Sequence, residues 1–111
     1  IHTYGNVCDM APIMELADSK GLLVVEDAAE AIGSKYMGRM AGTIAPLGIY
    51  SFHATKTITT GEGGAAVTSS VELRDRMRLF RSHGMSTRRY WHEVAGHNFR
   101  LTNMQAAIGC A

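Results

Sequence analysis

The first regular pattern along the chain is helical. Apolar residues recur at intervals of three and four positions and would form a single stripe: Met10, Ile13, Met14 and Ala17. Asp9 stands where an N-cap belongs, Pro12 suits a first helical turn, and Gly21 is a typical C-terminal stop. The pattern therefore predicts a helix between Asp9 and Gly21.

Short apolar runs on both sides of this helix predict strands. Residues 22–25 (Leu-Leu-Val-Val) form a continuous apolar run, which is typical of a parallel strand that is buried on both faces. Residues 1–4 fit the end of an earlier strand, with Gly5 and Asn6 as its turn. Strand, helix and strand in this order predict a βαβ unit and therefore an α/β fold.

The middle of the chain alternates between loops and strands. Residues 33–48 contain four glycines and predict a loop or a short hairpin, in which we expect the glycines to supply only backbone freedom. Residues 47–53 have a β-type pattern, and residues 65–68 form a second apolar strand. A loop rich in threonine and glycine lies between these two strands.

Two helix starts follow in the last part of the chain. Residues 69–72 have the spacing of a capping box and open a helix with a buried apolar stripe of Leu73, Met77 and Phe80. Gly84 is expected to end this helix. Residues 102–105 repeat the capping-box pattern and predict a final helix.

Composition and charge narrow the class of protein. The 111 residues fit at most one domain, and a net charge of +1 argues against a nucleic-acid partner. No apolar run approaches the ~20 residues that span a bilayer, so we expect no membrane segment. Cys8 and Cys110 are isolated and predict reduced thiols in a cytoplasmic protein. Because both ends fall within patterned segments, we expect residues 1–111 to be an internal piece of a longer protein.

Lys56 is the first candidate for chemistry. It follows the strand at 47–53, lies among small hydroxyl residues, and has no charged residue within five positions on either side. A lysine that is withdrawn from water and from like charges is a plausible Schiff-base nucleophile, because desolvation exposes the amine lone pair. The alternative is an ordinary loop lysine with its ammonium in water, since lysine is rarely buried. The residues alone leave both interpretations open.

Carboxylates follow the predicted strand at 22–25 directly, in the run Glu26-Asp27-Ala-Ala-Glu30. Open α/β sheets bind their ligands at the carboxyl ends of strands, which makes Asp27 a candidate ligand-binding residue. Asp27 would serve equally well as the cap of a following helical turn.

No metal site is predicted from the histidines. His92 and His97 are five positions apart, which on a helix separates their directions by about 140°, whereas the zinc-protease pair needs about 40°. Residues 61–64 (Gly-Glu-Gly-Gly) match neither a dinucleotide fingerprint nor a phosphate-binding P-loop.

Three separated segments together resemble one family. They are residues 26–31 (Glu-Asp-Ala-Ala-Glu-Ala), Ser51-Phe-x-x-x-Lys56 with the glycines at 61–64, and residues 96–109 (Gly-His-Asn-Phe-Arg-Leu-Thr-Asn-Met-Gln-Ala-Ala-Ile-Gly). In order, spacing and content they resemble the DegT/DnrJ/EryC1/StrS family of nucleotide-sugar aminotransferases, over essentially the whole chain. The resemblance implies an α/β fragment, residues 1–111, of the large cofactor domain of a fold-type-I enzyme, with a mostly parallel sheet and flanking helices.

The resemblance also implies pyridoxal 5'-phosphate as the cofactor and assigns three residues to its reactive parts. Lys56 matches the lysine that forms the Schiff base and later moves a proton between substrate and cofactor. Asp27 matches the carboxylate that faces the pyridine nitrogen and keeps it protonated. Ser51 matches a hydroxyl that binds the phosphate.

Three further residues receive roles from the same resemblance. Ala29 matches the small residue that packs on the ring face. Asn98 matches an asparagine that reaches the phosphate of the neighbouring subunit's cofactor, which implies a homodimer with shared active sites. Glu30 falls near the cofactor's phenolic oxygen, where many relatives carry glutamine or histidine. Since two adjacent anions repel each other, we expect Glu30 to be protonated or displaced.

The implied reaction moves an amino group from glutamate, the expected donor, to the 4-keto carbon of a nucleotide-linked 4-keto-6-deoxysugar, in polysaccharide (O-antigen) biosynthesis. The family's dehydratases are one alternative, but they carry histidine where Lys56 stands. A non-catalytic regulator on the same fold is a second alternative. A plain nucleotide-binding module would need a phosphate loop that the sequence lacks.

Overall fold

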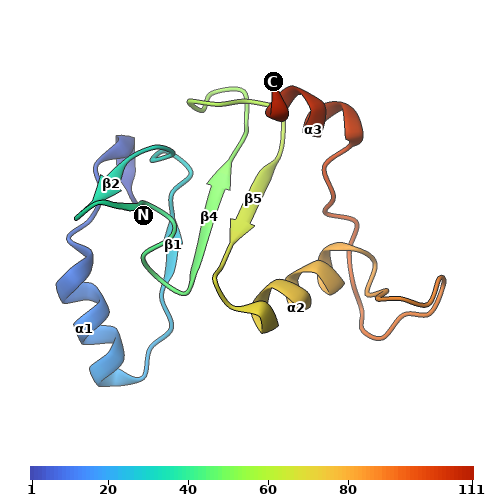
Figure 1. Ribbon diagram of the computed structural model, residues 1–111, viewed down its shortest axis with the longest axis horizontal. Coiled ribbons are helices and arrows are strands. Elements are labelled where there is room, and N and C mark those ends of the chain that lie inside the picture. The colour runs from blue at the N-terminus through green and yellow to red at the C-terminus, as the bar shows by residue number, and fades with distance from the viewer.

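The structure of the protein, a computed structural model, describes residues 1–111 (Figure 1). Its elements in chain order are a 3-10 turn (Thr3–Gly5), α1 (Met10–Lys20), β1 (Val25–Asp27), β2 (Lys35–Tyr36), β3 (Arg39–Met40), β4 (Leu47–Ser51), β5 (Gly64–Val67), α2 (Val71–Arg81) and α3 (Asn103–Cys110). Strands β1, β4 and β5 form one sheet, and β2 and β3 form a separate hairpin. The chain therefore has the predicted α/β character.

The three-stranded sheet combines both strand orientations. Strands β1 and β4 are parallel, with Asp27 opposite Ile49, whereas β4 and β5 are antiparallel, with Ser51 opposite Gly64. Because parallel strands end at the same edge of a sheet, the ends of β1 and β4 lie together. We call this edge, where Asp27 and Ser51 end their strands, the carboxyl edge.

The strand predicted at residues 22–25 lies further along the chain. Strand β1 covers Val25–Asp27, and Leu22 and Leu23 precede it with 59% and 93% of their surface exposed. The buried residue of β1 is Glu26, which is 2% exposed. The prediction of a strand buried on both faces was wrong, because residues 22–24 precede the sheet, Val25 is exposed within it, and a charged residue takes the interior position.

The strand predicted at residues 1–4 is absent. Thr3–Gly5 form a 3-10 turn in which Tyr4 has a φ of 54° and Gly5 a φ of 80°. The backbone N–H of His2 still donates to the carbonyl of Asp27 at 2.9 Å, beside β1. Positive φ values at two successive residues then turn the chain away from the sheet after this single contact.

Helix α1 occupies the predicted range but is not capped as predicted. Gly21 ends it in the left-handed conformation with a φ of 62°. The carboxylate of Asp9 makes no capping hydrogen bond and instead accepts one from the hydroxyl of Tyr36 at 2.5 Å. This contact joins the start of α1 to the β2–β3 hairpin.

The two later helices begin with side-chain caps. Ser70, one position after the predicted cap, accepts from the backbone N–H of Leu73 at 3.2 Å and starts α2. Helix α3 has both halves of the predicted capping box, made by Thr102 and Gln105. In Figure 1, α2 and α3 lie on the β5 side of the sheet, whereas α1 lies on the β1 side.

The packed interior is small and is built mainly from alanine. The buried hydrophobic residues are Met10, Ala17, Ala28, Ala31, Ala41 and Ala45. A Cβ on Gly48 of β4 would lie 1.9 Å from the carbonyl oxygen of Gly42. Glycines in residues 33–48 therefore do more than supply backbone freedom, contrary to the expectation, because here they let a loop pack directly on the sheet.

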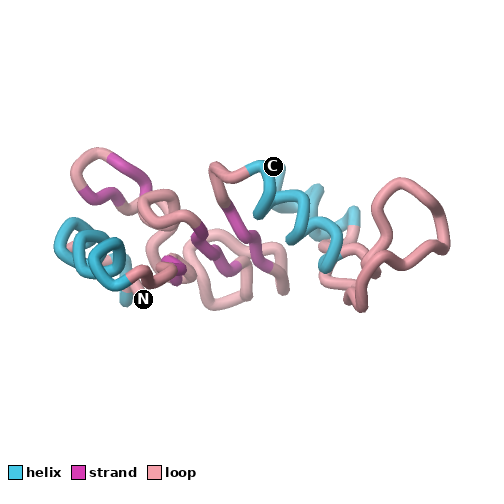
Figure 2. Tube along the Cα trace, turned by 90° about the horizontal axis from the view of Figure 1, so that it is seen from below, coloured by secondary structure: helices cyan, strands magenta, loops and turns pink.

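The apolar stripe of α2 is only partly covered. Leu73 and Phe80, which were predicted to be buried, are both exposed by more than a third. An apolar groove of about 670 Å³ lies between α2 and strands β4 and β5, and the segment at residues 99–101 borders it. The molecule is correspondingly flat, with extents of 45 × 35 × 18 Å, and Figure 2 shows its thin dimension with α1 at one end. None of its helices has the length and apolarity that crossing a bilayer requires.

Candidate active site

The carboxyl edge of the sheet collects most of the predicted site residues. Asp27 ends β1 and Ser51 ends β4, and both are half-buried. The loop at residues 52–63, which carries Lys56, leaves β4 at this edge and returns into β5, as Figure 1 shows above the two strands. The parallel β1–β4 pair therefore positions the candidate residues by topology.

Lys56 forms an ion pair with Glu30 that is not apparent from the sequence. Its Nζ donates to Oε1 of Glu30 at 3.2 Å, and the two side chains are 23% and 34% exposed. Glu30 lies 26 positions earlier in the chain, so the uncharged neighbours of Lys56 in sequence do not describe its surroundings in space. Lys56 thus fits neither interpretation fully, because its side chain is half-buried yet carries a counter-ion.

Glu30 is an anion in this arrangement. Its Oε2 accepts from the backbone N–H of Tyr4 at 2.9 Å, and its Oε1 accepts from Lys56. The hydrogen bond from Tyr4, followed by the one from Lys56, lowers the pKa of Glu30 below its usual value despite a small opposing effect of burial. Of the two expected alternatives, protonated or displaced, these hydrogen bonds favour an ionised Glu30 whose carboxylate turns toward Lys56.

Asp27 caps the turn that follows β1, and one of its carboxylate oxygens remains available for a ligand. Its Oδ1 accepts from the backbone N–H of Ala29 at 3.1 Å, which stabilises the turn after β1. Its Oδ2 has no hydrogen-bond partner in the chain. Ser51 is similar, because its Oγ accepts from the N–H of His53 at 3.3 Å and leaves its own hydrogen free.

Asn98 does not join these residues. It forms an isolated antiparallel bridge with Ser82, just after α2, and its Oδ1 accepts from Nε of Arg100 at 3.0 Å. Within one chain Asn98 therefore forms no hydrogen bond with Asp27, Ser51 or Lys56.

A second carboxylate, Glu26, was not singled out by sequence reasoning. Its oxygens accept from the backbone N–H groups of Gly42 (2.8 Å), Ile44 (2.6 Å) and Ala45 (2.5 Å). Nε2 of His2 lies 3.0 Å from Oε2 and donates to it, because Nδ1 of His2 accepts from a backbone N–H. A charge directly after a predicted strand was the one available signal for this cluster.

The hydrogen bonds keep Glu26 ionised in the interior. Burial raises the pKa of Glu26, but the hydrogen bonds from His2, Ala45, Gly42 and Ile44 together outweigh it, and the pKa falls below its usual value. The anion therefore ties β1 to the loop that follows β3.

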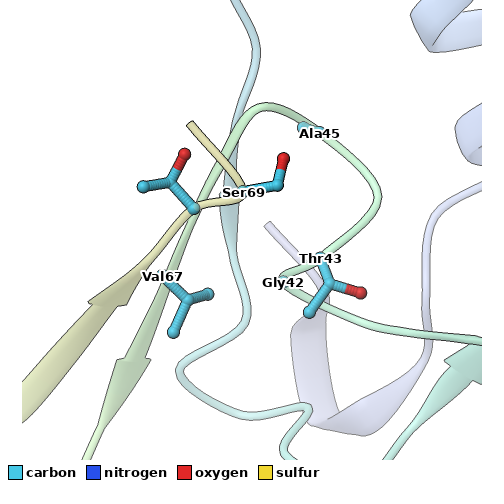
Figure 3. A pocket seen from close by; sticks show the side chains of 6 residues that line it. Gly42, Thr43, Ala45, Val67 and Ser69 are labelled. Carbon is cyan, nitrogen blue, oxygen red and sulfur yellow. The ribbon is translucent and has the colours of Figure 1, made fainter. Parts of the chain in front are cut away.

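A separate cavity lies away from Lys56 and Ser51. It has a volume of about 240 Å³ and is lined by Gly42, Thr43, Ala45, Val67, Thr68 and Ser69 (Figure 3). These residues precede β4 and follow the start of β5, so the cavity lies at the opposite edge of the sheet from Lys56. It holds no charged side chain, and we do not include it in the candidate site.

Comparison with known proteins gives one consistent family. The model of the DegT/DnrJ/EryC1/StrS aminotransferase family matches residues 1–111. The chain is 52% identical to a GDP-perosamine synthase of Escherichia coli O157:H7, over 100% of this chain and 31% of that protein. Residues 84–92 are the part in which we also find a narrower resemblance to the GDP-perosamine synthases.

Solved structures with similar folds include aminotransferases of this family. The chain superimposes on Helicobacter pylori PseC, an aminotransferase of pseudaminic acid biosynthesis, with a TM-score of 0.93 and 38% identity, over 98% of this chain and 30% of that one. Streptomyces venezuelae DesV, solved in complex with a ketimine intermediate, gives a TM-score of 0.90 and 45% identity, over 96% and 29%. The chain thus spans about a third of the length of these relatives.

Proposed function

Because the chain belongs to the DegT/DnrJ/EryC1/StrS aminotransferase family, we propose that it is the cofactor-binding part of a nucleotide-sugar aminotransferase that depends on pyridoxal phosphate. The observation that carries this proposal is the meeting of Lys56, Asp27 and Ser51 at the carboxyl edge of one sheet. We propose further that residues 1–111 form an internal fragment of the large domain, which is supported by the 31% coverage of the perosamine synthase.

The donor set at the carboxyl edge fits this cofactor. Lys56 offers a half-enclosed primary amine, Asp27 offers a carboxylate oxygen without a protein partner, and Ser51 offers a free hydroxyl hydrogen. Ala29 presents only a methyl group beside them. An aldehyde, a ring nitrogen and a phosphate require these three kinds of polar group.

Each residue then has a distinct task. When bound, pyridoxal phosphate supplies an aldehyde that condenses with amines and a ring that accepts electrons. Lys56 would hold the cofactor covalently and later hold a transferable proton at Nζ. Asp27 would keep a proton on the ring nitrogen through its negative charge, and Ser51 would donate to a phosphate oxygen. Glu30, beside Lys56, would lie near the cofactor as well.

The finer features of the reaction are part of the same proposal. We take glutamate as the amino donor and the 4-keto carbon of a nucleotide-linked 6-deoxysugar as the acceptor, since the E. coli relative is named a GDP-perosamine synthase. A role in polysaccharide biosynthesis in the cytoplasm fits such a substrate. Both cysteines are free thiols, which agrees with that location.

Two alternatives are less well supported by the chain. A sugar dehydratase of the family would carry histidine at the position of Lys56. A regulator without catalytic activity would have no need to keep Lys56, Asp27 and Ser51 together.

The proposed site is shared between two subunits. We propose that Asn98 donates to the phosphate in the partner's site, because within its own chain it pairs with Ser82 and Arg100 and with none of the residues at the carboxyl edge. A neutral amide adds a donor without adding charge. Bound cofactor would then stabilise the homodimer.

Complementation tests the shared site. Full-length Lys56→Ala and Asn98→Asp proteins should each be inactive, and mixing them under conditions that exchange subunits should restore activity. In the mixed dimer one of the two sites then has both residues intact. Absence of recovery, with exchange verified by differently tagged subunits, would assign Asn98 to its own chain or to no site.

The function itself is tested by absorbance. Full-length protein should develop a visible band with pyridoxal phosphate, and glutamate should convert this band to the absorbance of the amine form. A protein that binds the cofactor but does not respond to glutamate, or to any other amino donor, would contradict the proposed aminotransferase.

A further inference from the structure

The backbone at Tyr4 has an unfavourable conformation that allows its N–H to hydrogen-bond to Glu30. Its φ of 54° lies in the left-handed region, which costs a non-glycine residue free energy. The Tyr4 side chain is exposed, so packing of the ring does not account for this conformation. The conformation directs the Tyr4 N–H at Oε2 of Glu30, 2.9 Å away.

The turn around Tyr4 is fixed from both sides. Before it, His2 is buried, hydrogen-bonds to Glu26 at 3.0 Å, and donates its N–H to the carbonyl of Asp27. After it, a Cβ on Gly5 would lie 3.6 Å from the carbonyl oxygen of Glu30, so the turn packs closely on the segment that carries Glu30. Buried contacts therefore maintain the conformation of Tyr4.

Glu30 receives a donor at each of its two oxygens. Tyr4 N–H reaches Oε2 and the Lys56 ammonium reaches Oε1. Only a carboxylate can accept at both atoms, because glutamine would present an NH₂ group to one of the two donors. The site therefore distinguishes glutamate from glutamine by chemistry and not by size.

We propose that Glu30 is a positioning residue that, anchored by the strained turn at Tyr4, holds the Lys56 side chain at the carboxyl edge before the cofactor arrives. An ammonium in an ion pair has no free lone pair, so Lys56 must leave Glu30 and lose a proton before Nζ attacks an aldehyde carbon. Glu30 thus fixes the position of the Lys56 side chain before the cofactor binds. The ion pair also limits the reaction of Lys56 with other electrophiles.

Neighbouring charges do not provide a second restraint. The ion pairs of the chain give Lys56 no partner other than Glu30. His53 and Glu62, from the loop that carries Lys56, face each other at 3.6 Å. Asp27 uses Oδ1 for the turn after β1. The restraint on Lys56 therefore depends on Glu30.

Competitive reductive methylation of the full-length, cofactor-free protein tests this inference. Formaldehyde with a borane reductant methylates free amines, and peptide mass spectrometry gives the rate at Lys56 relative to Lys20 and Lys35. In Glu30→Gln this relative rate should rise about two- to fivefold, the range that a partly exposed ion pair supports. Glu30→Asp retains the charge and should give a smaller rise. Glu62→Gln is the matched control and should leave the ratio unchanged.

The inference builds on the proposed role of Lys56, but this assay needs no cofactor, so the two can fail separately. An unchanged ratio in Glu30→Gln, with native melting behaviour, would show that Glu30 does not restrain Lys56. A melting temperature lowered by more than about 4 °C in Glu30→Gln alone would make Glu30 a structural anchor instead of a positioning residue. Attachment of pyridoxal phosphate to another lysine would refute the proposed function and leave the restraint measurable.

Discussion

Glu26 and Glu30 lie four positions apart on either side of Asp27, yet they occupy opposite kinds of environment. Glu26 is buried and accepts from three backbone amides and a histidine that is itself buried. Glu30 is partly exposed and accepts from one backbone amide and a lysine. Both are anions, and hydrogen bonds lower the pKa of each.

The difference lies in what each carboxylate holds. Three of the four partners of Glu26 are backbone groups that cannot leave without opening the fold, and the fourth is the buried His2. The second partner of Glu30 is a flexible side chain that can leave. Glu26 thus holds the backbone of residues 42–45 next to β1, whereas Glu30 holds the side chain of Lys56, which can move. Variants at the two positions should therefore separate stability from chemistry.

The largest effect should come from removing the mobile group. Lys56→Ala is expected to abolish aminotransferase activity and the visible cofactor band, because no other residue at the carboxyl edge offers a primary amine. Far-UV circular dichroism and the melting temperature should stay close to native, since the lost ion pair is partly exposed. Lys35→Ala, on the β2–β3 hairpin, is the control and should keep the band. Residual turnover in Lys56→Ala would place the nucleophile elsewhere.

Glu26→Gln should cost stability instead. Four donors converge on the Glu26 carboxylate, and an amide there leaves at least one buried donor unpaired. We expect a loss of about 4 kcal/mol in the free energy of unfolding, measured by denaturant titration of the full-length protein. Glu62→Gln, which removes an exposed carboxylate, should change it little. Equal losses in the two variants would remove the distinction between Glu26 and the surface glutamates.

Asp27→Asn tests the position between the two glutamates. Asparagine keeps the turn contact with Ala29 but removes the charge, so the cofactor should still bind while turnover falls. We expect a loss of about 3 kcal/mol in transition-state stabilisation, as for other preorganised electrostatic groups. The measurement is kcat/KM beside the melting temperature. Near-normal turnover would leave Asp27 with only its turn-capping role.

Acid should weaken the fold through Glu26 by a smaller amount. Because the folded-state pKa of Glu26 is lowered from 4.5, its contribution is present above the unfolded-state value and is lost as pH falls through the folded-state pKa. Below pH 4.5 the native protein should lose stability more steeply than Glu26→Gln, by at most about 1.4 kcal/mol per pH unit. Parallel curves for the two proteins would show that Glu26 does not titrate with unfolding.

The sequence predicted local structure where local signals decide it. Gly21 ends α1 and the capping box at Thr102 starts α3, because each depends on residues within one turn of the chain. The glycines of residues 33–48 left a loop or a short hairpin open, and the structure has the β2–β3 hairpin there. Strand β1 was misplaced, because hydrogen bonds from residues 42–45 decide which of its residues is buried.

The candidate site shows the same limit. The resemblance implied a mostly parallel sheet, and the parallel pairing of β1 with β4 brings Asp27 and Ser51 to one edge. The pairing of Lys56 with Glu30 was not, because 26 positions separate them and the sequence shows Lys56 among uncharged residues. The strained backbone conformation of Tyr4 depends on the burial of His2. The hydrophobic periodicity of the sequence does not predict that burial.

The account depends most directly on which lysine carries the cofactor. Full-length protein loaded with pyridoxal phosphate should be reduced with borohydride, digested, and mapped by mass spectrometry. The account predicts the pyridoxyl group on Lys56, at the carboxyl edge of the sheet, and unmodified Lys20 and Lys35. A pyridoxyl group on Lys20 or Lys35, with Lys56 unmodified, would contradict it.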